Sequence, residues 1–353
     1  MSTSPQARVS VIIPARNEAA NIARVVRSLA QQQDIGEILV VDDQSTDRTG
    51  EILAGLQVEI PLLRTLRVES LPEGWLGKTH AAAQGARAAT GDWLLFTDAD
   101  TEHLAGSLAE LLQRAEDERA DLLSVSPGQE TPTWWEKSVI PCVYVKLASL
   151  FRFEEVSDPH SPAAAANGQY LLVRREIYER SGGHAAVKSE ILEDVELARR
   201  IKALGGKLLF LPGAQWVRTR MYHTYREMRQ GWTKNLYLLY GGNLSRMWAA
   251  VASLWLLDVL PVLAFVAACL WVAFGRAGSV VTLMAAGLCF LALAREWNYG
   301  RALARLGFDP VLASYQPIGA ALLGALMLGS WRAHRSMGSI EWKGRHYATK
   351  GKG

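Results

Sequence analysis

The stretch Trp93-Leu94-Leu95-Phe96-Thr97-Asp98-Ala99-Asp100 places two carboxylates, one residue apart, directly after four apolar residues. This order predicts a buried strand that ends in a polar turn. In an open α/β sheet, ligands bind in the crevice at the carboxyl ends of the strands. Two acidic side chains there suit a hard divalent cation that carries phosphates. By itself, however, Asp-X-Asp is equally typical of a solvated turn or a helix N-cap.

Strand-like runs alternate with amphipathic helical stretches around this motif. We predict strands at residues 9–14, 37–41, 93–96 and 122–125, and helices at residues 19–32, 46–56 and 78–90. Strands and helices that alternate with short links form a parallel sheet with helical crossovers. The fold class expected for this part is therefore α/β, of a nucleotide-binding type, although a fold alone does not determine function.

The bulk composition narrows the function only slightly. The chain has 353 residues, enough for one large or two modest domains, and its net charge of +3 is too small to indicate a nucleic acid partner. Cys142, Cys269 and Cys289 are far apart, so we expect buried small hydrophobes instead of disulfides or a zinc site. Residues 1–8 include no long apolar stretch, so we expect no secretory signal and a cytoplasmic first domain.

Three long apolar runs follow, at residues 248–274, 279–294 and 311–331. A spanning helix needs about 20 mainly apolar residues. The first run is ample and the third is adequate, whereas the second needs residues 295–297 to reach the interface. Apolar core helices of a soluble domain are the alternative, but three such runs in succession favour a membrane protein.

Two charge cues for the membrane topology conflict. The link at residues 275–278 carries one charge, whereas Arg295, Arg301 and Arg305 follow the second run, which predicts that this second loop is cytoplasmic. Three crossings would then place the tail outside, although it is basic. Its cations are Arg332, Arg335, Lys343, Arg345, Lys350 and Lys352. We therefore expect the third run, which Gln316-Pro317 interrupts, to be re-entrant or interfacial.

Residues 134–153 mix aromatic, aliphatic and charged side chains. This mixture is typical of a helix that lies in the plane of a membrane surface. A core helix of the first domain is the alternative interpretation.

A second acidic turn follows the second predicted strand, in Val40-Val41-Asp42-Asp43-Gln44-Ser45-Thr46-Asp47. Acidic residues at this position commonly contact a ribose or a base edge. Capping of the next helix would explain Ser45 and Asp47, but it explains the pair Asp42-Asp43 less well. A dinucleotide site is disfavoured because Pro14-Ala15-Arg16-Asn17-Glu18 occupies the first turn in place of a glycine-rich loop, and no phosphate-binding loop is present.

Four motifs in order identify a family. They are Ile12-Ile13-Pro14-Ala15-Arg16-Asn17-Glu18, Val40-Val41-Asp42-Asp43-Gln44-Ser45, Gly77-Lys78 ahead of Gly91-Asp92, and Asp98-Ala99-Asp100. With them the chain resembles the family 2 glycosyltransferases of the GT-A fold, from about residue 9 to residue 243. The resemblance implies a Rossmann-like, mostly parallel sheet that binds a nucleotide sugar.

The resemblance also predicts a third acidic site, which Glu190-Ile191-Leu192-Glu193-Asp194-Val195-Glu196 supplies. Asp194 matches the catalytic base of the family. An inverting transfer needs a carboxylate that accepts the proton of the acceptor hydroxyl as this hydroxyl attacks the anomeric carbon. The alternative for Glu193, Asp194 and Glu196 is a favourable charge at the start of a helix.

The same resemblance assigns the donor site. Asp43, beside Asp42, would contact uracil, and Pro14, Ala15, Arg16 and Glu18 would line the base and the ribose. Lys78 would face the phosphates. Asp98 and Asp100 would contact the ribose and bind Mg²⁺ or Mn²⁺, with Asp100 as the expected direct ligand of the metal.

Acceptor residues are implied less clearly. Lipid-acceptor members carry a Gln-X-X-Arg-Trp element, and here Arg229-Gln230-Gly231-Trp232 keeps only part of it. Arg229, Gln230, Trp232 and Glu193 are the candidates for acceptor and diphosphate binding, and a basic-aromatic helix that binds lipid headgroups is the alternative. Asn167-Gly168-Gln169 and Gly182-Gly183-His184 match positions near the acceptor pocket. The tail at residues 341–347 resembles the ending of membrane-bound members.

The sequence thus predicts a membrane-bound, inverting, metal-dependent glycosyltransferase similar to ceramide, carotenoid and hopanoid glycosyltransferases. It would move a hexose from a nucleotide diphosphate sugar, with UDP expected, to a lipid hydroxyl. The alternatives are a polyprenyl-phosphate sugar synthase that uses GDP-mannose or UDP-glucose, and a non-catalytic protein that binds nucleotide sugars. We expect a cytoplasmic domain at 1–246 with helices near 133–153 and 222–243, two or three spans within 247–331 in the inner membrane, and a basic tail at 332–353. Nothing in the sequence indicates an oligomeric state.

Overall fold

The computed structural model describes residues 9–274, 278–336, 339–342 and 345–348, which form two compact units. The first unit takes in the chain up to residue 130 and residues 150–221, and the second takes in residues 131–149 and 222 onwards. The predictions for residues 1–8, for most of the link at 275–278 and for residues 337–338, 343–344 and 349–353 of the tail lie outside the described residues.

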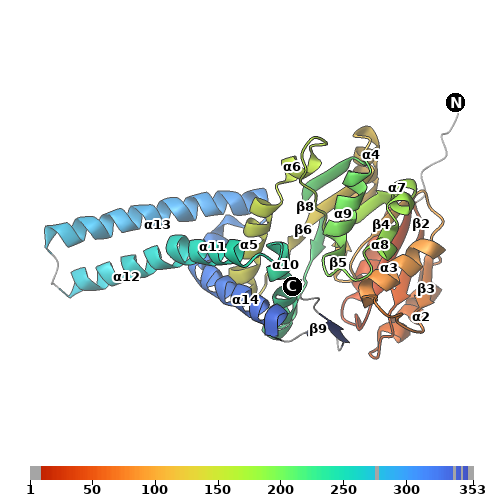
Figure 1. The fold of residues 1–353 in the computed structure, drawn as a ribbon, viewed down its shortest axis with the longest axis horizontal. Coiled ribbons are helices and arrows are strands. Elements are labelled where there is room, and N and C mark those ends of the chain that lie inside the picture. Colours follow the sequence, from red (N-terminus) through yellow and green to blue (C-terminus); the bar gives the residue numbers. More distant parts are fainter. Residues whose placement is uncertain (1–8, 275–277, 337–338, 343–344, 349–353) are drawn as a thin grey trace. The chain divides into compact units, whose positions relative to one another are not determined.

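The described residues of the first unit form an eight-stranded sheet with the order β3-β2-β1-β4-β7-β6-β8-β5 (Figure 1). The strands are β1 (Val9–Ala15), β2 (Ile35–Asp42), β3 (Leu63–Arg67), β4 (Trp93–Phe96), β5 (Thr101–His103), β6 (Leu122–Gln129), β7 (Leu171–Arg174) and β8 (Leu208–Thr219). The helices are α1 (Ile22–Ala30), α2 (Thr49–Glu59), α3 (Gly77–Ala88), α4 (Ser107–Asp117), α6 (Phe153–Ser157), α7 (Arg175–Arg180), α8 (Gly183–Ala186) and α9 (Glu193–Ala203).

The strand pairing brings the predicted site residues to one edge of the sheet. β1 lies between β2 and β4 and is parallel to both. Ala15 pairs with Asp42 and Ile12 pairs with Phe96, so the turns that follow β2 and β4 leave the sheet on the same side. The predicted α/β sheet is confirmed, with β7 and β5 as its antiparallel members.

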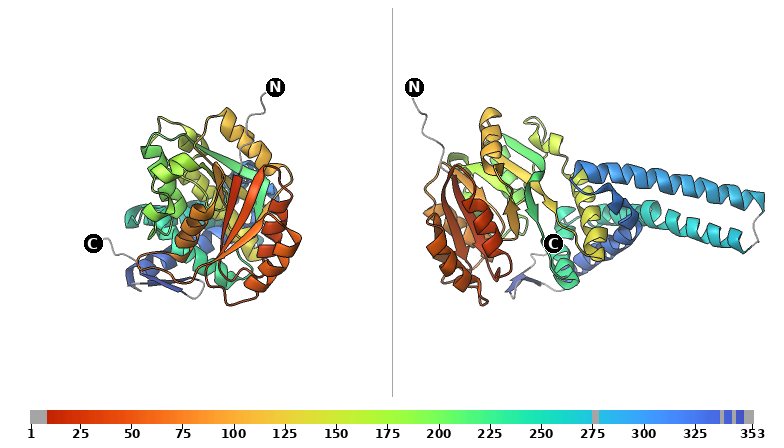
Figure 2. Two further views of the ribbon diagram at one scale, coloured as in Figure 1. Left: turned by 90° about the vertical axis from the view of Figure 1, so that its right-hand side faces the viewer. Right: turned by 180° about the vertical axis from the view of Figure 1, so that it is seen from behind.

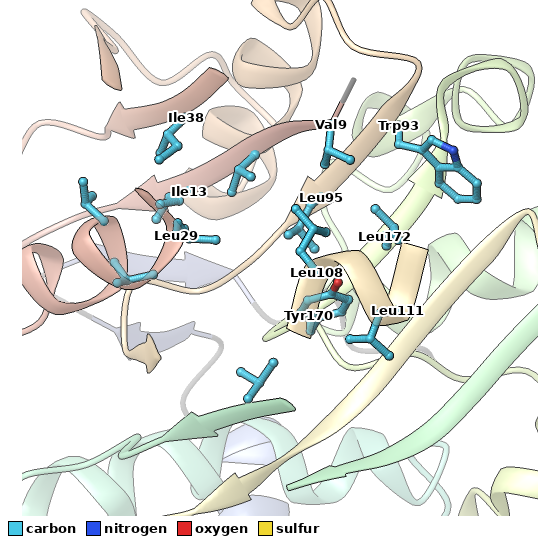
Figure 3. Close-up of a cluster of buried hydrophobic side chains, with 14 of the residues drawn as sticks. Val9, Ile13, Leu29, Ile38, Trp93, Leu95, Leu108, Leu111, Tyr170 and Leu172 are labelled. Atoms are coloured by element: carbon cyan, nitrogen blue, oxygen red, sulfur yellow. The ribbon is translucent and has the colours of Figure 1, made fainter. Parts of the chain in front are cut away.

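Both faces of the sheet are covered by helices (Figure 2). Val11 and Ile13 of β1 face one cluster of buried side chains, and Ile12 faces the other, as the two-residue period of a strand requires. Figure 3 shows the first cluster, to which Leu29, Leu95 and Tyr170 also belong, from elements well separated in sequence.

Gly85 sets the distance between α3 and the sheet. A Cβ atom at this position would lie 3.1 Å from Val41 Cγ2 and closer still to Ile12 Cγ2. Only glycine allows this approach. The close contact fixes α3, and with it Lys78 near the start of the helix.

The second unit is helical. Its elements are α5 (Trp134–Leu150), α10 (Tyr225–Leu239), α11 (Leu244–Leu254), a π-helical turn η1 (Trp255–Val259), α12 (Leu260–Ala273), α13 (Ser279–Arg305), a 3₁₀ turn η2 (Pro310–Tyr315), α14 (Gln316–Ser336) and the antiparallel strands β9 (Ser339–Trp342) and β10 (Arg345–Ala348). Three helical stretches of the described chain are long and apolar enough to cross a membrane, at Leu244–Ala273, Val280–Arg305 and Pro310–Arg335. The predicted C-terminal membrane helices are therefore present.

Two details differ from the sequence predictions. Cys142 is buried, but Cys269 is exposed on α12 and Cys289 is half-buried on α13, so the expectation of buried cysteines is wrong for Cys269. The helix α5 is buried over nearly all of its first half, which fits a core helix better than an amphipathic surface helix. It belongs to the second unit and not to the sheet domain.

A buried carboxylate ties three strands together. Glu37 on β2 accepts hydrogen bonds from Ser10 Oγ at 2.8 Å and from the Thr90 backbone N–H at 2.7 Å, and it pairs with Arg64 Nη1 at 2.5 Å. Burial alone would raise the pKa of Glu37, but the hydrogen bonds from Ser10, Thr90 and Arg64 outweigh it and hold the pKa below its ordinary value. Glu37 thus stabilises the fold fully at pH values above the pKa that it has in the unfolded chain. This contribution is lost as the pH falls through the lower pKa that Glu37 has in the folded protein.

We predict that Glu37→Ala destabilises the protein by about 2–4 kcal/mol, because it leaves several buried donors without an acceptor. Thermal unfolding in detergent at neutral pH measures the change. Glu51→Ala is the matched control, since Glu51 pairs with Arg48 on an exposed surface, where ion pairs contribute little. Equal melting temperatures for the two variants would contradict the structural role of Glu37.

Candidate active site

The turn after β4 is fixed by hydrogen bonds to its main chain. Arg24 Nη2 donates to the Asp100 carbonyl at 2.9 Å, and Thr101 Oγ1 donates to the Asp98 carbonyl at 2.8 Å. Thr97 Oγ1 donates to the Gln169 carbonyl at 2.7 Å. The backbone is held in place by these bonds, and the side chains of Asp98 and Asp100 remain half-buried.

Lys78 joins this turn to the start of α9. Its Nζ lies 2.8 Å from Asp98 Oδ1 and 2.9 Å from Glu193 Oε1. Burial would lower the pKa of Lys78, but the negative charges of Asp98, Glu193 and Asp194 outweigh it and raise this pKa well above its ordinary value. Lys78 is therefore a permanent cation in the site. A cation at the start of a helix opposes the helix dipole, so the two carboxylates are needed to stabilise it there.

Asp194 is held by two backbone N–H groups. Its Oδ2 accepts from Gly168 at 2.8 Å and its Oδ1 accepts from Val195 at 2.8 Å. Burial and then the charge of Glu193 raise the pKa of Asp194 to about 6, against the opposing effects of Lys78 and the two N–H groups. A carboxylate with this pKa is ionised at neutral pH and is still basic enough to accept a proton.

Gly168 lies between the cation and the base. A Cβ atom on it would lie 3.0 Å from Lys78 Nζ and 3.4 Å from Asp194 Oδ2. A side chain here would press on the ends of both side chains and shift them by a few tenths of an ångström, so a glycine suits this position.

The turns after β1 and β2 are bonded to each other. Arg16 Nη1 donates to the Asp43 carbonyl at 2.7 Å, and the Asp43 N–H donates to the Ala15 carbonyl at 2.8 Å. Asp42 and Asp43 are buried, and Asp42 Oδ1 accepts from the Ser45 N–H at 2.9 Å. The residues that these turns place together are those predicted for the nucleotide: Pro14, Ala15, Arg16, Glu18, Asp42 and Asp43.

Two residues of the second turn hold the loop itself, but only Asp47 bonds to the start of the next helix, so the capping interpretation does not apply to Ser45. Asp47 Oδ1 accepts from the Thr49 N–H at 3.0 Å, at the start of α2, and Ser45 Oγ accepts from the Asn17 N–H at 2.9 Å. Their side chains are therefore used by the fold.

The buried histidines are structural. His103 Nε2 lies 3.1 Å from Thr97 Oγ1, and burial lowers the pKa of His103 to about 3. His184 Nδ1 lies 3.0 Å from the Tyr178 hydroxyl, and burial lowers the pKa of His184 to about 4. Both rings are neutral at physiological pH.

The chemistry of Asp98 and Asp100 fits a divalent cation. Their carboxylates come from one turn, and oxygen is the ligand that Mg²⁺ and Mn²⁺ prefer. Among the residues that the structure describes, no group of three or more His, Cys, Asp or Glu side chains could hold a metal. The protein would thus supply only part of the coordination, which suits a cation that shares its ligands with a bound diphosphate.

The acceptor candidates on α10 belong to the second unit. Arg229 is exposed, Gln230 is half-buried, and Trp232 is buried with its ring edge against Tyr222, at 6.3 Å between centroids. The departure from the Gln-X-X-Arg-Trp pattern has a steric reason. A Cβ atom at Gly231 would lie 2.7 Å from the Tyr222 ring, so an arginine has no room there. The roles of Arg229, Gln230 and Trp232 stay predictions.

Sequence reasoning missed Arg24, which holds the Asp100 carbonyl and pairs with Glu130 at 3.4 Å. It lies on the polar side of an ordinary amphipathic helix, so nothing local marked it. Gly168 was noted only as part of a motif near the acceptor pocket, and its contact with Asp194 gives that motif a physical role.

Comparisons with known proteins agree with this geometry. Residues 10–182 match the family described as Glycosyl transferase family 2. The chain is 27% identical over 358 residues to 4,4'-diaponeurosporenoate glycosyltransferase of Staphylococcus aureus strain MRSA252, with 96% of this chain and 88% of that protein covered. The protein of the same name from strain bovine RF122 / ET3-1 is also 27% identical, with the same coverage.

One solved structure is similar along most of the chain. It is the mannosyltransferase PcManGT from Pyrobaculum calidifontis in complex with GDP-Man and Mn²⁺, with a TM-score of 0.52 and 19% identity. The match covers 94% of this chain and 87% of that chain, and it supports the fold. With the four motifs in order, the matched family and the sheet described above, residues 10–182 are identified as a glycosyl transferase family 2 domain, and the chain has the GT-A fold.

Proposed function

We propose that this protein is a membrane-bound inverting glycosyltransferase that moves a hexose from a UDP-sugar to the hydroxyl group of a lipid. The observation that carries the proposal is the chain of contacts from Asp98 through Lys78 to Glu193, with Asp194 beside them. It joins the predicted diphosphate end of the donor site to the predicted base.

Asp194 would accept the proton of the acceptor hydroxyl. The hydroxyl oxygen then forms a bond to the anomeric carbon as the bond from this carbon to the diphosphate breaks on the opposite side, which inverts the configuration. Gly168 and Val195 hold the Asp194 carboxylate by their N–H groups and so fix its direction.

Lys78 would stabilise the negative charge of the diphosphate, because its raised pKa keeps it protonated. Asp100, with Asp98, would hold Mg²⁺ or Mn²⁺, which supplies Lewis-acid stabilisation of the leaving nucleotide. Arg16 and Asp43 would position the base and the ribose of the donor.

A lipid acceptor is proposed because the catalytic sheet is followed by helices that suit a membrane. A soluble acceptor would not require a catalytic domain attached to a bilayer. The similarity to 4,4'-diaponeurosporenoate glycosyltransferase supports a lipid-like acceptor. We propose that the protein lies in the inner membrane with the residues up to about 246, which include the sheet domain, in the cytoplasm.

The first experiment tests the donor and the acceptor. We expect purified protein with Mn²⁺ to transfer sugar from a UDP-sugar to extracted membrane lipids, measured with a radiolabelled donor. Transfer from GDP-mannose to polyprenyl phosphate, with none from any UDP-sugar, would instead identify a polyprenyl-phosphate sugar synthase. Donor binding without any transfer would identify a non-catalytic binding protein.

The second experiment tests the base. We expect Asp194→Asn to reduce turnover by about 10²- to 10⁴-fold, the usual contribution of a general base, and to retain UDP binding. Binding is measured as the rise in melting temperature with added UDP and Mn²⁺. Glu196→Gln, two residues further along α9 and paired with Arg199 on the surface, is the matched control and should keep its turnover. Normal turnover of Asp194→Asn would remove this residue as the base.

The third experiment uses the pH dependence of kcat/KM. Because the base must be ionised, activity should rise tenfold per pH unit below about pH 6 and level off above it. The charge of Glu193 raises the pKa of Asp194, so Glu193→Gln should move this acidic limb to lower pH. A limb that stays in place, or moves to higher pH, would mean that another group controls the profile.

A further inference from the structure

The helices α12 and α13 expose an uninterrupted apolar surface. They run side by side (Figures 1 and 2), and Phe274, which directly follows α12, and Leu283 on α13 are 76% and 72% exposed. Residues 259–274 and 280–294 include no Asp, Glu, Lys or Arg. A surface of this kind is stable only in contact with lipid.

The helix α14 has a different environment, although its composition is similar. Within the most apolar part of each candidate span, 44% of the residues are buried for the span that contains α14, against 11% and 6% for the spans of α12 and α13. A Cβ atom at Gly319 would lie 2.8 Å from Cys142 Sγ and closer still to the Ser138 carbonyl, so α14 touches the backbone of α5. A Cβ atom at Gly324 would lie 3.2 Å from Trp255 Nε1. Protein, and not lipid, covers much of α14.

The helices α12 and α13 form a helical hairpin. The N-terminal end of α14 is bonded to this hairpin at the end opposite to the link between its two helices. Asp258, in η1, is buried and pairs with Arg295 of α13, and Gln316 Nε2 donates to Asp258 Oδ1 at 2.7 Å. This polar cluster joins all three apolar stretches at one level. An ion pair so close to hydrocarbon needs partners of this kind to satisfy its charges.

The length of the hairpin places this cluster at one boundary of the membrane. Beyond Asp258, the sixteen residues 259–274 span about 24 Å, and beyond Arg295, the fifteen residues 280–294 span about 22 Å. These lengths are about 6 to 8 Å short of the hydrocarbon thickness of about 30 Å, a difference that local thinning of the bilayer can make up. Each of the two helices therefore suffices for one crossing that starts at the cluster. Arg301 and Arg305 then lie on the same side of the membrane as the cluster.

The other end of α14 lies against α10. Ser330 Oγ accepts from the Tyr237 N–H at 2.9 Å, and the rings of Tyr237 and His334 lie 5.5 Å apart. The helix α10 is not a membrane helix, because it carries Arg226, Glu227, Arg229 and Lys234 within its fifteen residues. It follows the last strand of the sheet after only a few residues, so it lies on the side of the membrane where the sheet domain lies.

We infer that the chain crosses the bilayer twice, through α12 and α13, and that α14 does not cross but returns along α5 and η1 to α10. A third crossing would pull Ser330 and His334 away from Tyr237. The C-terminal end of α14 thus lies on the side of the catalytic domain. This arrangement removes the conflict between the charge cues, because the basic tail then lies on the same side as the cationic C-terminal part of α13, which carries Arg295, Arg301 and Arg305.

Labelling with a membrane-impermeant maleimide tests this topology without relying on sugar transfer. Single cysteines are introduced as Glu51→Cys in the sheet domain, Gly278→Cys at the tip of the hairpin and Arg335→Cys at the end of α14, in a chain that carries Cys142→Ser, Cys269→Ser and Cys289→Ser. In intact bacteria we expect labelling at position 278 alone. Positions 51 and 335 should become labelled together, after permeabilisation.

Two outcomes would overturn the inference. Labelling of positions 278 and 335 together in intact cells would show a third crossing. Labelling of position 278 together with position 51 would show that the hairpin does not cross. If the sheet domain lay on the outer side, positions 51 and 335 would be labelled together in intact cells, and position 278 only after permeabilisation. An error in the proposed cytoplasmic location can therefore be distinguished from an error in topology.

A pair of glycine variants tests whether protein covers α14. Gly319→Leu should lower the melting temperature in detergent or prevent purification of folded protein, because the new side chain meets α5. Gly287→Leu on α13 is the matched control, because a Cβ atom there would have no atom within 4 Å. Equal tolerance of both substitutions would mean that α14 faces lipid as α13 does.

Discussion

The arrangement of the candidate site depends on the two ion pairs of Lys78. Three segments that are far apart in sequence, namely the start of α3, the turn after β4 and the start of α9, meet at its ammonium group. Without this cation, Asp98, Glu193 and Asp194 would be like charges in a partly buried place, and their repulsion would separate the segments. Burial contributes most to the raised pKa of Asp194, and the charges of Glu193 and Lys78 then act on it in opposite directions, so the contacts that hold the start of α9 also adjust the basicity of Asp194.

The parts of this site that the sequence predicts are those that local patterns determine. Asp43 and Asp98 each follow a run of strand residues, and parallel strands on either side of β1 necessarily bring their ends to one edge. The prediction of an α/β sheet therefore implies that the two turns are neighbours. The family resemblance adds Asp194, which no periodic pattern would separate from an ordinary helix start.

The parts that the sequence does not predict are contacts between surfaces that look ordinary in isolation. Arg24 is a polar residue on an amphipathic helix, and its bond to the Asp100 carbonyl exists only because α1 lies beside β5. The helix α14 is as apolar as α13, and composition alone treats the two alike. Their difference comes from the partners α5 and α10, which are separated from α14 by more than 70 residues of sequence.

Glycines inside helices mark several of these contacts. Such a glycine costs about 1 kcal/mol relative to alanine, so a helix tolerates it most readily where a neighbour leaves no room for a Cβ atom. Gly85 in α3, Gly231 in α10 and Gly319 in α14 all meet this condition. They bring α3 to the sheet, Tyr222 to α10, and α14 to α5. Gly287 in α13 has no neighbour within 4 Å, and a helix surrounded by lipid has no protein surface to approach. The contrast between Gly319 and Gly287 thus separates the helix that packs on protein from the helix that faces the bilayer.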